Sequence, residues 1–231
     1  MRVVLIVLVL AASAHADMPY DAVGKVVLPG GGHGSCVLIY TSDDKALVVT
    51  NAHVIAFHAE STVVLARCKY AAKTVAYEPT VDLAFLVINK PPIKPVNLGP
   101  RDTHVVFTGY PHYDCCDLHW QYGNIVKEDL KRSTWRNGPV PGMSGGAVFD
   151  RKDGDLCGIV SWTDGKYGGG VADEPLLLYA AKYKDPESWV PDASYIEGVE
   201  EGDWEYAKQR RRVVTKEYKT TKAPHWKVYD E

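Results

Sequence analysis

The stretch Pro141-Gly142-Met143-Ser144-Gly145-Gly146-Ala147 places one serine inside a glycine-rich turn that runs into a short apolar segment. Glycine adopts the unusual backbone dihedral angles of such a turn at little cost, so the turn can aim two backbone N–H groups at one point. Two N–H groups aimed in this way stabilise the negative oxygen that develops during acyl transfer. Ser144 is therefore a candidate nucleophile.

Two motifs upstream of this turn contain the other residue types that a serine nucleophile needs. Val48-Val49-Thr50-Asn51-Ala52-His53-Val54 is a strand-like run ending in Ala-His, and Thr80-Val81-Asp82-Leu83-Ala84-Phe85-Leu86 places an aspartate at the start of another strand. A serine hydroxyl needs a base to take its proton at neutral pH, and histidine titrates near neutrality. A buried carboxylate fixes the imidazole tautomer and stabilises its charged form.

Short apolar runs alternate with turn-forming residues between residues 23 and 181. The runs rich in Val, Ile, Leu and Tyr, which we predict to be strands, are 26–28, 36–40, 46–50, 62–66, 83–88, 105–108, 121–126, 147–149, 157–162 and 176–179. No long stretch between them has a helical hydrophobic period. Many short strands separated by Gly and Pro indicate a sandwich or barrel. Four prolines within residues 91–100 mark a midpoint at which two small barrels would join.

Taken together, the motifs resemble the trypsin-like serine peptidases of the chymotrypsin fold, in particular the branch that includes HtrA-type and many bacterial and viral enzymes. The resemblance spans roughly residues 30–170, in the family order His, Asp, Ser. It rests on Thr50-Asn51-Ala52-His53-Val54, Asp82-Leu83-Ala84, Gly142-Met143-Ser144-Gly145-Gly146 and Gly158-Ile159-Val160-Ser161-Trp162. It implies an all-β protein of two packed antiparallel six-stranded β-barrels, followed by a polar C-terminal tail.

The resemblance also implies a catalytic role for each matching residue. His53 would be the general base, Asp82 would orient it, and Ser144 would attack a peptide carbonyl to form an acyl-enzyme. The backbone N–H groups of Gly142 and Ser144 would form the oxyanion hole. No metal or organic cofactor is implied, and the expected partner is a protein or peptide substrate. A relative that only binds peptides, without cleaving them, is the alternative from another functional class.

The resemblance also predicts which residues bind the substrate, and these lie on either side of Ser144 in the sequence. Ser161 would support Asp82, and Ser161, Trp162 and Thr163 would hold the substrate backbone as an added strand. Gly138 stands where trypsin-type enzymes carry an acidic group, so a basic P1 residue is not expected. Thr163 replaces a glycine that keeps the pocket open in many relatives, which suggests a small or medium apolar P1 residue. Asp164 could still attract a cation.

Two departures separate this sequence from zymogen-activated animal enzymes. Met143 stands where those enzymes have an aspartate that pairs with the new N-terminus, and Val54 stands where many have a cysteine after the catalytic histidine. We therefore expect an oxyanion hole that forms without an N-terminal salt bridge. Both departures favour the bacterial and viral branches.

The two ends of the chain differ from its middle. Residues 1–16 have the positive start, apolar run and small-residue ending of a secretory signal, which predicts a secreted or periplasmic protein with residues 17–181 as the peptidase domain. Without cleavage, the apolar run would anchor the protein in a membrane. Residues 182–231 are predicted to be a charged tail with an unidentified partner. In some small RNA-virus polyproteins the protease region precedes a charged segment with an available tyrosine. Tyr206 or Tyr218 could be that tyrosine, so such a viral protease is an alternative interpretation of this chain.

The chain has 231 residues with a formal net charge of −3, which argues against nucleic-acid binding by the peptidase domain. In an exported protein its five cysteines are candidates for disulfides, and an odd number leaves one thiol unpaired within the chain. We expect Cys36 to pair with Cys68, and Cys115 or Cys116 to pair with Cys157. The cluster of His and Cys at 112–119 fits no common zinc module, so no metal is predicted.

Overall fold

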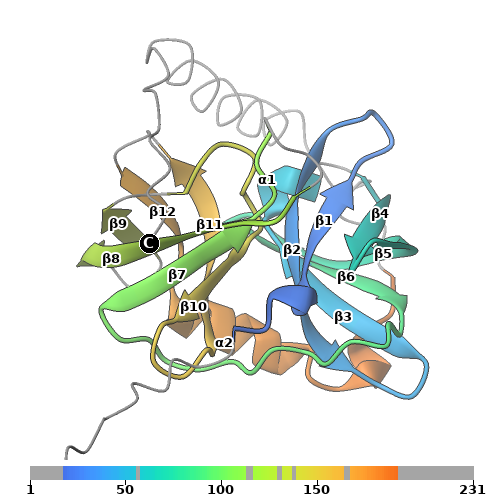
Figure 1. Ribbon diagram of the computed structural model, residues 1–231. Helices are drawn as coiled ribbons and strands as arrows, with labels where there is room; N and C mark the ends of the chain where they lie inside the picture. Colours follow the sequence, from blue (N-terminus) through green and yellow to red (C-terminus); the bar gives the residue numbers. More distant parts are fainter. Residues whose placement is uncertain are drawn as a thin grey trace, which may run out of the picture.

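The computed structural model describes residues 18–55, 58–112, 117–128, 132–136, 139–163 and 167–191. These residues form two closed antiparallel β-barrels of six strands each, which lie side by side (Figure 1). The predicted fold class is therefore confirmed. The predicted signal at residues 1–16 and the tail beyond residue 191 lie outside the described residues.

The first barrel contains the strands from the N-terminal half of the chain, joined in the order β1-β2-β3-β6-β5-β4. Its strands are β1 (Val23–Val27), β2 (His33–Thr41), β3 (Lys45–Thr50), β4 (Glu60–Leu65), β5 (Cys68–Glu78) and β6 (Leu83–Asn89). A short 3-10 helix, η1 (Tyr20–Ala22), precedes β1, and one helical turn, α1 (Ala52–Ile55), follows β3. Every residue from Ala46 to Thr50 is buried, which matches the unbroken apolar run that predicted this strand.

The second barrel joins its strands in the order β10-β11-β12-β9-β8-β7. They are β7 (His104–Gly109), β8 (His119–Glu128), β9 (Arg132–Arg136), β10 (Ala147–Asp150), β11 (Leu156–Thr163) and β12 (Tyr167–Val171). Its interior is filled by a small cluster in which the rings of Phe107 and Trp135 pack 4.8 Å apart. Met143 belongs to this cluster, so the turn before Ser144 is fastened to the barrel by apolar packing.

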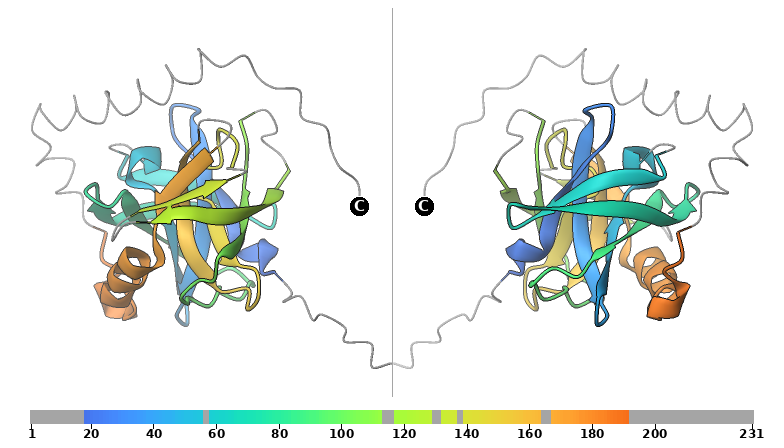
Figure 2. Two further views of the ribbon diagram at one scale, coloured as in Figure 1. Left: turned by 90° about the vertical axis from the view of Figure 1, so that its left-hand side faces the viewer. Right: turned by 90° about the vertical axis from the view of Figure 1, so that its right-hand side faces the viewer.

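The segment predicted as a strand at 176–179 is helical, and this prediction is wrong. Residues Asp173–Lys182 form α2, followed by the 3-10 helix η2 (Pro186–Ser188). Leu176 and Ala180 are buried on one side of α2 while Leu178 is 63% exposed, so one face of the helix packs against the barrels. Figure 2 shows α2, in orange, at the opposite end of the barrels from α1. Trp189 is also buried, so apolar packing continues beyond residue 181, where we placed the end of the peptidase domain.

The expected disulfides are not present. Cys36, Cys68 and Cys157 are free thiols. Cys36 lies fully buried on β2, whereas Cys68 is exposed at the start of β5, so the two do not meet. The Cys157 Sγ donates to the Val148 carbonyl at 3.2 Å inside the second barrel. Cys115 and Cys116 lie outside the described residues, and no described helix is long and apolar enough to cross a membrane.

Candidate active site

His53 and Asp82 come from neighbouring elements of the first barrel and form a close pair. His53 lies on α1, directly after β3, and Asp82 lies directly before β6, the strand that pairs with β3. The His53 Nδ1 is 2.9 Å from each carboxylate oxygen of Asp82, and the His53 backbone N–H donates to Oδ1 at 3.1 Å. The side chains are 33% and 10% exposed, so the carboxylate is buried behind a partly accessible imidazole.

Asp82 has a left-handed backbone, with φ of 62°. Burial by itself raises the pKa of its carboxyl group, but the charge and hydrogen bonds of His53, together with a hydrogen bond from the Ser161 side chain, outweigh burial and lower the pKa. The carboxyl group is therefore ionised at neutral pH. An ionised carboxylate accepts hydrogen bonds only, so the imidazole proton resides on Nδ1 and Nε2 is left as an acceptor.

Asn51 connects this pair to the second barrel, a contact for which the sequence provided no role. Its Nδ2 donates to the Asp82 backbone carbonyl at 2.9 Å and to the Ser161 Oγ at 3.0 Å. Asn51 is fully buried at the end of a buried strand. A polar residue in that position is the signal that sequence reasoning passed over, since buried polar groups require partners.

The turn around Ser144 needs glycine at two positions. Gly142 has φ of 99° and Gly145 has φ of 84°, in the left-handed region that side chains disfavour. A Cβ on Gly145 would lie 2.0 Å from the Ser35 carbonyl oxygen, and one on Gly142 would lie 2.2 Å from the His112 backbone nitrogen. The glycines that suggested the turn in the sequence are therefore required by both dihedral angle and space.

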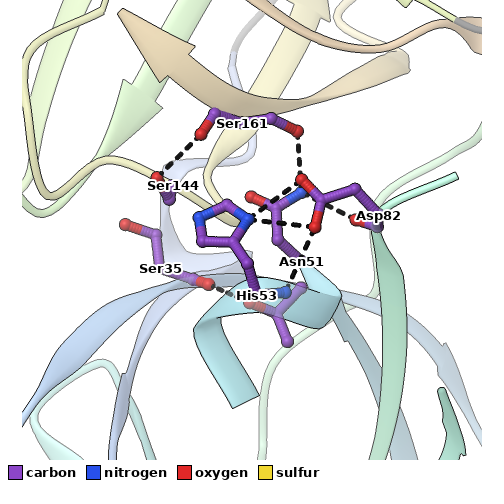
Figure 3. A network of polar contacts seen from close by, with 7 residues as sticks. Ser35, Asn51, His53, Asp82, Ser144 and Ser161 are labelled. Carbon is purple, nitrogen blue, oxygen red and sulfur yellow. Dashed lines mark hydrogen bonds and ion pairs between the residues drawn. The ribbon is translucent and has the colours of Figure 1, made fainter. Parts of the chain in front are cut away.

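Ser144 lies beside the imidazole of His53, on the side away from Asp82 (Figure 3). Its hydroxyl donates to the Ser161 backbone carbonyl at 3.1 Å. Among the described residues, no hydrogen bond involves the backbone N–H of Gly142 or of Ser144. Gly142 is buried, and a buried N–H without an acceptor is costly unless a ligand supplies one. These two N–H groups are therefore suited to binding an anionic oxygen.

Ser35 on β2 holds the turn to the first barrel and was not foreseen from the sequence. Its backbone N–H donates to the Ser144 carbonyl at 2.7 Å, and its Oγ accepts from the Tyr110 N–H at 2.8 Å. Its own carbonyl accepts from the buried Thr50 hydroxyl at 2.7 Å. Residues from both barrels therefore fix the position of Ser144.

The structure describes some of the predicted substrate-binding residues and not others. Ser161, Trp162 and Thr163 end β11, where Thr163 pairs with Gly168 and its hydroxyl donates to the Tyr167 carbonyl at 3.2 Å. The Trp162 indole covers Gly169, because a Cβ there would lie 2.4 Å from it. Gly138 and Asp164 lie outside the described residues, so the pocket for the P1 side chain is not defined.

Of the predicted cluster at 112–119, residues 113–116, including Cys115 and Cys116, lie outside the described residues. The His112 ring packs edge-on against His33, with centroids 4.8 Å apart, and burial is the main cause that lowers the pKa of both. Within the described ranges, no three His, Cys, Asp or Glu residues gather in a way that could hold a metal ion.

A comparison with protein families matches residues 34–159 to the trypsin-like peptidase domain. The match runs from β2 to the first half of β11 and includes His53, Asp82 and Ser144. No curated protein matches the chain.

Solved structures similar to this chain include bacterial and viral proteases. The active form of the Rv3671c protease from M. tuberculosis is 26% identical, with a TM-score of 0.60 over 71% of this chain and 81% of that chain. The serine protease of a human pathogenic astrovirus is 23% identical, with a TM-score of 0.55 over 69% of this chain and 94% of that chain. The HtrA-type protease AlgW, solved with a tripeptide, is 23% identical, with a TM-score of 0.59 over 72% of this chain and 61% of that chain. The resemblance to the bacterial and viral branch is therefore confirmed.

Proposed function

The chain belongs to the family of trypsin-like peptidase domains, and we propose that it is a serine endopeptidase that hydrolyses peptide bonds with His53, Asp82 and Ser144. One observation supports this most directly. The His53 Nδ1 lies 2.9 Å from both oxygens of a buried carboxylate. Ser144 lies across the ring in a turn with two N–H groups that are bonded to no described residue. Nucleophilic acyl transfer needs this combination of base, orienting acid and oxyanion donors.

The proposed reaction begins when a peptide carbonyl enters the site. The Ser144 Oγ attacks the carbonyl carbon as its proton passes to the His53 Nε2, and the N–H groups of Gly142 and Ser144 bind the oxyanion. The imidazolium then donates this proton to the leaving amine, which departs from the acyl-enzyme. Water, which loses a proton to the His53 Nε2, then attacks the acyl carbon. As the bond to the Ser144 oxygen breaks, the imidazolium passes its proton to that oxygen and the acyl group leaves as a carboxylic acid. Asp82 remains ionised throughout and stabilises the imidazolium.

Substrate binding has a direct consequence for the Ser144 hydroxyl. In the free protein this hydroxyl donates to the Ser161 carbonyl at 3.1 Å. A peptide that adds as a strand along residues 161–163 would offer its own N–H to that carbonyl and release the hydroxyl toward His53. The substrate is thus proposed to be an extended peptide, and the tripeptide solved with the AlgW protease is consistent with this class.

A fluorophosphonate probe tests the proposed function, because it reacts covalently with an activated serine. We expect wild-type protein to be labelled and Ser144→Ala to lose all labelling. Ser42→Ala is the matched control, since Ser42 lies in an exposed turn where its hydroxyl bonds the Lys45 carbonyl; this variant should be labelled like wild type. A well-folded wild-type protein that resists the probe and cleaves no peptide library would indicate a peptide-binding relative and overturn the proposal.

A further inference from the structure

Asn51 contacts both the Asp82 backbone and the Ser161 side chain, yet the proposed reaction uses neither contact. Its side-chain amide lies between Asp82 and Ser161, behind the His53 imidazole (Figure 3). Asn51 and Thr50 are fully buried, so solvent cannot replace these hydrogen bonds. Any effect of Asn51 on the reaction must therefore act through Asp82 and Ser161.

The orientation of the Asn51 amide is determined by its partners. A backbone carbonyl only accepts hydrogen bonds, so the atom 2.9 Å from the Asp82 carbonyl must be Nδ2 and not Oδ1. The second hydrogen on Nδ2 is then available to the Ser161 Oγ, 3.0 Å away. Asn51 is therefore a donor to both residues.

The direction of the Ser161 hydroxyl follows from this donation. Because Ser161 Oγ accepts a hydrogen bond from Asn51, its own proton must point elsewhere. The Asp82 carboxylate, whose pKa the Ser161 side chain lowers, is the acceptor available for that proton. An acceptor in place of the Asn51 amide would compete with Asp82 for it.

The same amide also holds the Asp82 backbone. Asp82 has φ of 62°, and its carbonyl accepts from Asn51 while its N–H donates to the Pro79 carbonyl at 3.3 Å. These two hydrogen bonds stabilise a left-handed conformation that non-glycine residues disfavour. The conformation in turn determines where the Asp82 carboxylate meets His53.

We propose that Asn51 is a positioning residue for the reaction: its amide holds the Asp82 backbone and directs the Ser161 proton to the Asp82 carboxylate, which keeps that carboxylate aligned with His53. This inference rests on the proposed peptidase function, since the role is defined relative to the His53–Asp82 pair. It does not require Asn51 to touch the substrate.

The variants Asn51→Ala, Asn51→Asp and Ser161→Ala test this role by peptide hydrolysis. Asn51→Asp has nearly the same shape but replaces both donors with acceptors. We expect kcat to fall by about tenfold or more in both Asn51 variants, with KM changed much less. The acid limb of the kcat/KM profile, which reports the coupled His53–Asp82 pair, should move to higher pH because Asn51 no longer directs the Ser161 proton to the carboxylate. Asn51→Ala should lower activity less in the Ser161→Ala variant than in the wild-type protein, because the link through Ser161 is already absent there.

A control separates positioning from general stability. Thr74 is buried in the same barrel, and its hydroxyl donates to the His58 carbonyl at 3.1 Å. Thr74→Val should lower the melting temperature and leave kcat and the pH profile unchanged. If Asn51→Ala behaves like Thr74→Val, or if only Asn51→Asp moves the acid limb, the proposal is wrong. Should Asn51→Ala fail to fold, Ser161→Ala interrupts the same link from the second barrel and must show the same shift.

A second readout does not depend on peptide cleavage. In the Ser144→Ala background, NMR titration of the His53 ring reports the His53–Asp82 pair directly. Introducing Asn51→Ala there should change the titration midpoint, and Thr74→Val should not. If wild type is not labelled by fluorophosphonate but the titration still moves, the peptidase proposal fails while Asn51 retains its positioning role. An unmoved midpoint in a folded variant would overturn the inference itself.

Discussion

Asp82 combines a left-handed backbone with a buried ionised side chain, two features that each cost free energy in isolation. The backbone, with φ of 62°, is held by hydrogen bonds from its own N–H and to its carbonyl. The carboxylate is stabilised by the His53 side chain, the His53 backbone N–H and the Ser161 side chain. Strained residues of this kind persist where their surroundings fix them, and here every fixing group except the Pro79 carbonyl belongs to the candidate active site.

We predict that the effect of Asp82→Asn on stability depends on pH. Asparagine tolerates a left-handed backbone, so the variant should fold. Because folding lowers the pKa of Asp82, ionisation stabilises the protein above the unfolded value of about 4, and this contribution is lost as pH falls through the lower folded value. Urea unfolding at several pH values should show the free-energy gap between wild type and Asp82→Asn narrowing from pH 6 to pH 3. A gap that stays constant over this range would contradict the prediction.

We predict that Gly145→Ala is destabilising mainly because a Cβ does not fit there, and less because of backbone strain. Gly145 and Gly31 share φ of 84°, but a Cβ on Gly145 would lie 2.0 Å from the Ser35 carbonyl oxygen, whereas one on Gly31 meets nothing within 4 Å. Gly31→Ala should therefore cost only the backbone strain, about 1 kcal/mol. Gly145→Ala should cost at least about 3 kcal/mol and lower the melting temperature far more. Equal costs in calorimetry would show that the turn relaxes around the new methyl group.

At the scale of elements, helix α2 shows why a local pattern was misread. The run Leu176-Leu177-Leu178-Tyr179 looks like a strand because it is apolar and short. The structure shows a helix that buries Leu176 and Ala180, four residues apart. Asp173, Glu174 and Pro175 in its first turn are a helix-start signal that outweighs the apolar run. The strands with unbroken apolar runs, such as β3 and β6, were predicted correctly because burial on both faces leaves that signature.

Strand β12 could not be predicted because its stability comes from distant residues. It contains Gly168-Gly169-Gly170, and glycine disfavours strands. The Trp162 indole occupies the space beside Gly169, and Trp135 with the Ile159 carbonyl oxygen occupies the space beside Gly170. The strand therefore forms because larger neighbours fill the room that its missing side chains leave. The same limit applies to the candidate site: motifs predicted His53, Asp82 and Ser144, but the contacts of Asn51 with Ser161 and of Ser35 with Ser144 exist only after the barrels meet.

An ion pair at the start of α2 should contribute measurably to the stability of the protein. Arg101, which lies between the barrels in sequence, donates from Nη1 to Asp173 Oδ1 at 2.8 Å, and their side chains are 7% and 19% exposed. Arg101→Met leaves the Asp173 charge without this partner and should lower the free energy of unfolding by about 3 kcal/mol. At the other end of α2, Lys182 and Glu78 are 3.7 Å apart with side chains 54% and 25% exposed. Lys182→Met, measured by the same urea titration, should cost less than about 1 kcal/mol. If both variants lose a similar amount of unfolding free energy, burial does not strengthen the Arg101–Asp173 ion pair.

At the scale of the whole molecule, the site depends on the two barrels keeping one arrangement. His53 and Asp82 belong to the first barrel, while Ser144 and Ser161 belong to the second. The segment between the barrels is hydrogen-bonded to both, because the Val96 N–H donates to the Leu38 carbonyl at 3.0 Å and the Leu156 N–H donates to the Asn97 carbonyl at 2.8 Å. One hydrophobic cluster also continues from the first barrel to Phe149, Leu156 and Ile159 of the second.

This continuity predicts that the barrels unfold together. If separating them exposes the shared cluster and breaks the hydrogen bonds of the connecting segment, a state with one barrel intact gains little and should not accumulate. In a urea titration, the midpoints measured by far-UV circular dichroism, by tryptophan fluorescence and by fluorophosphonate labelling should therefore coincide. Trp135 is buried inside the second barrel, and Trp189 packs in the cluster that the two barrels share, so Trp135→Phe and Trp189→Phe assign the fluorescence to the second barrel and to the shared cluster. Labelling lost at lower urea than the fluorescence of either tryptophan would show that the barrels move apart while each remains folded, and the site would then be the weakest contact between them.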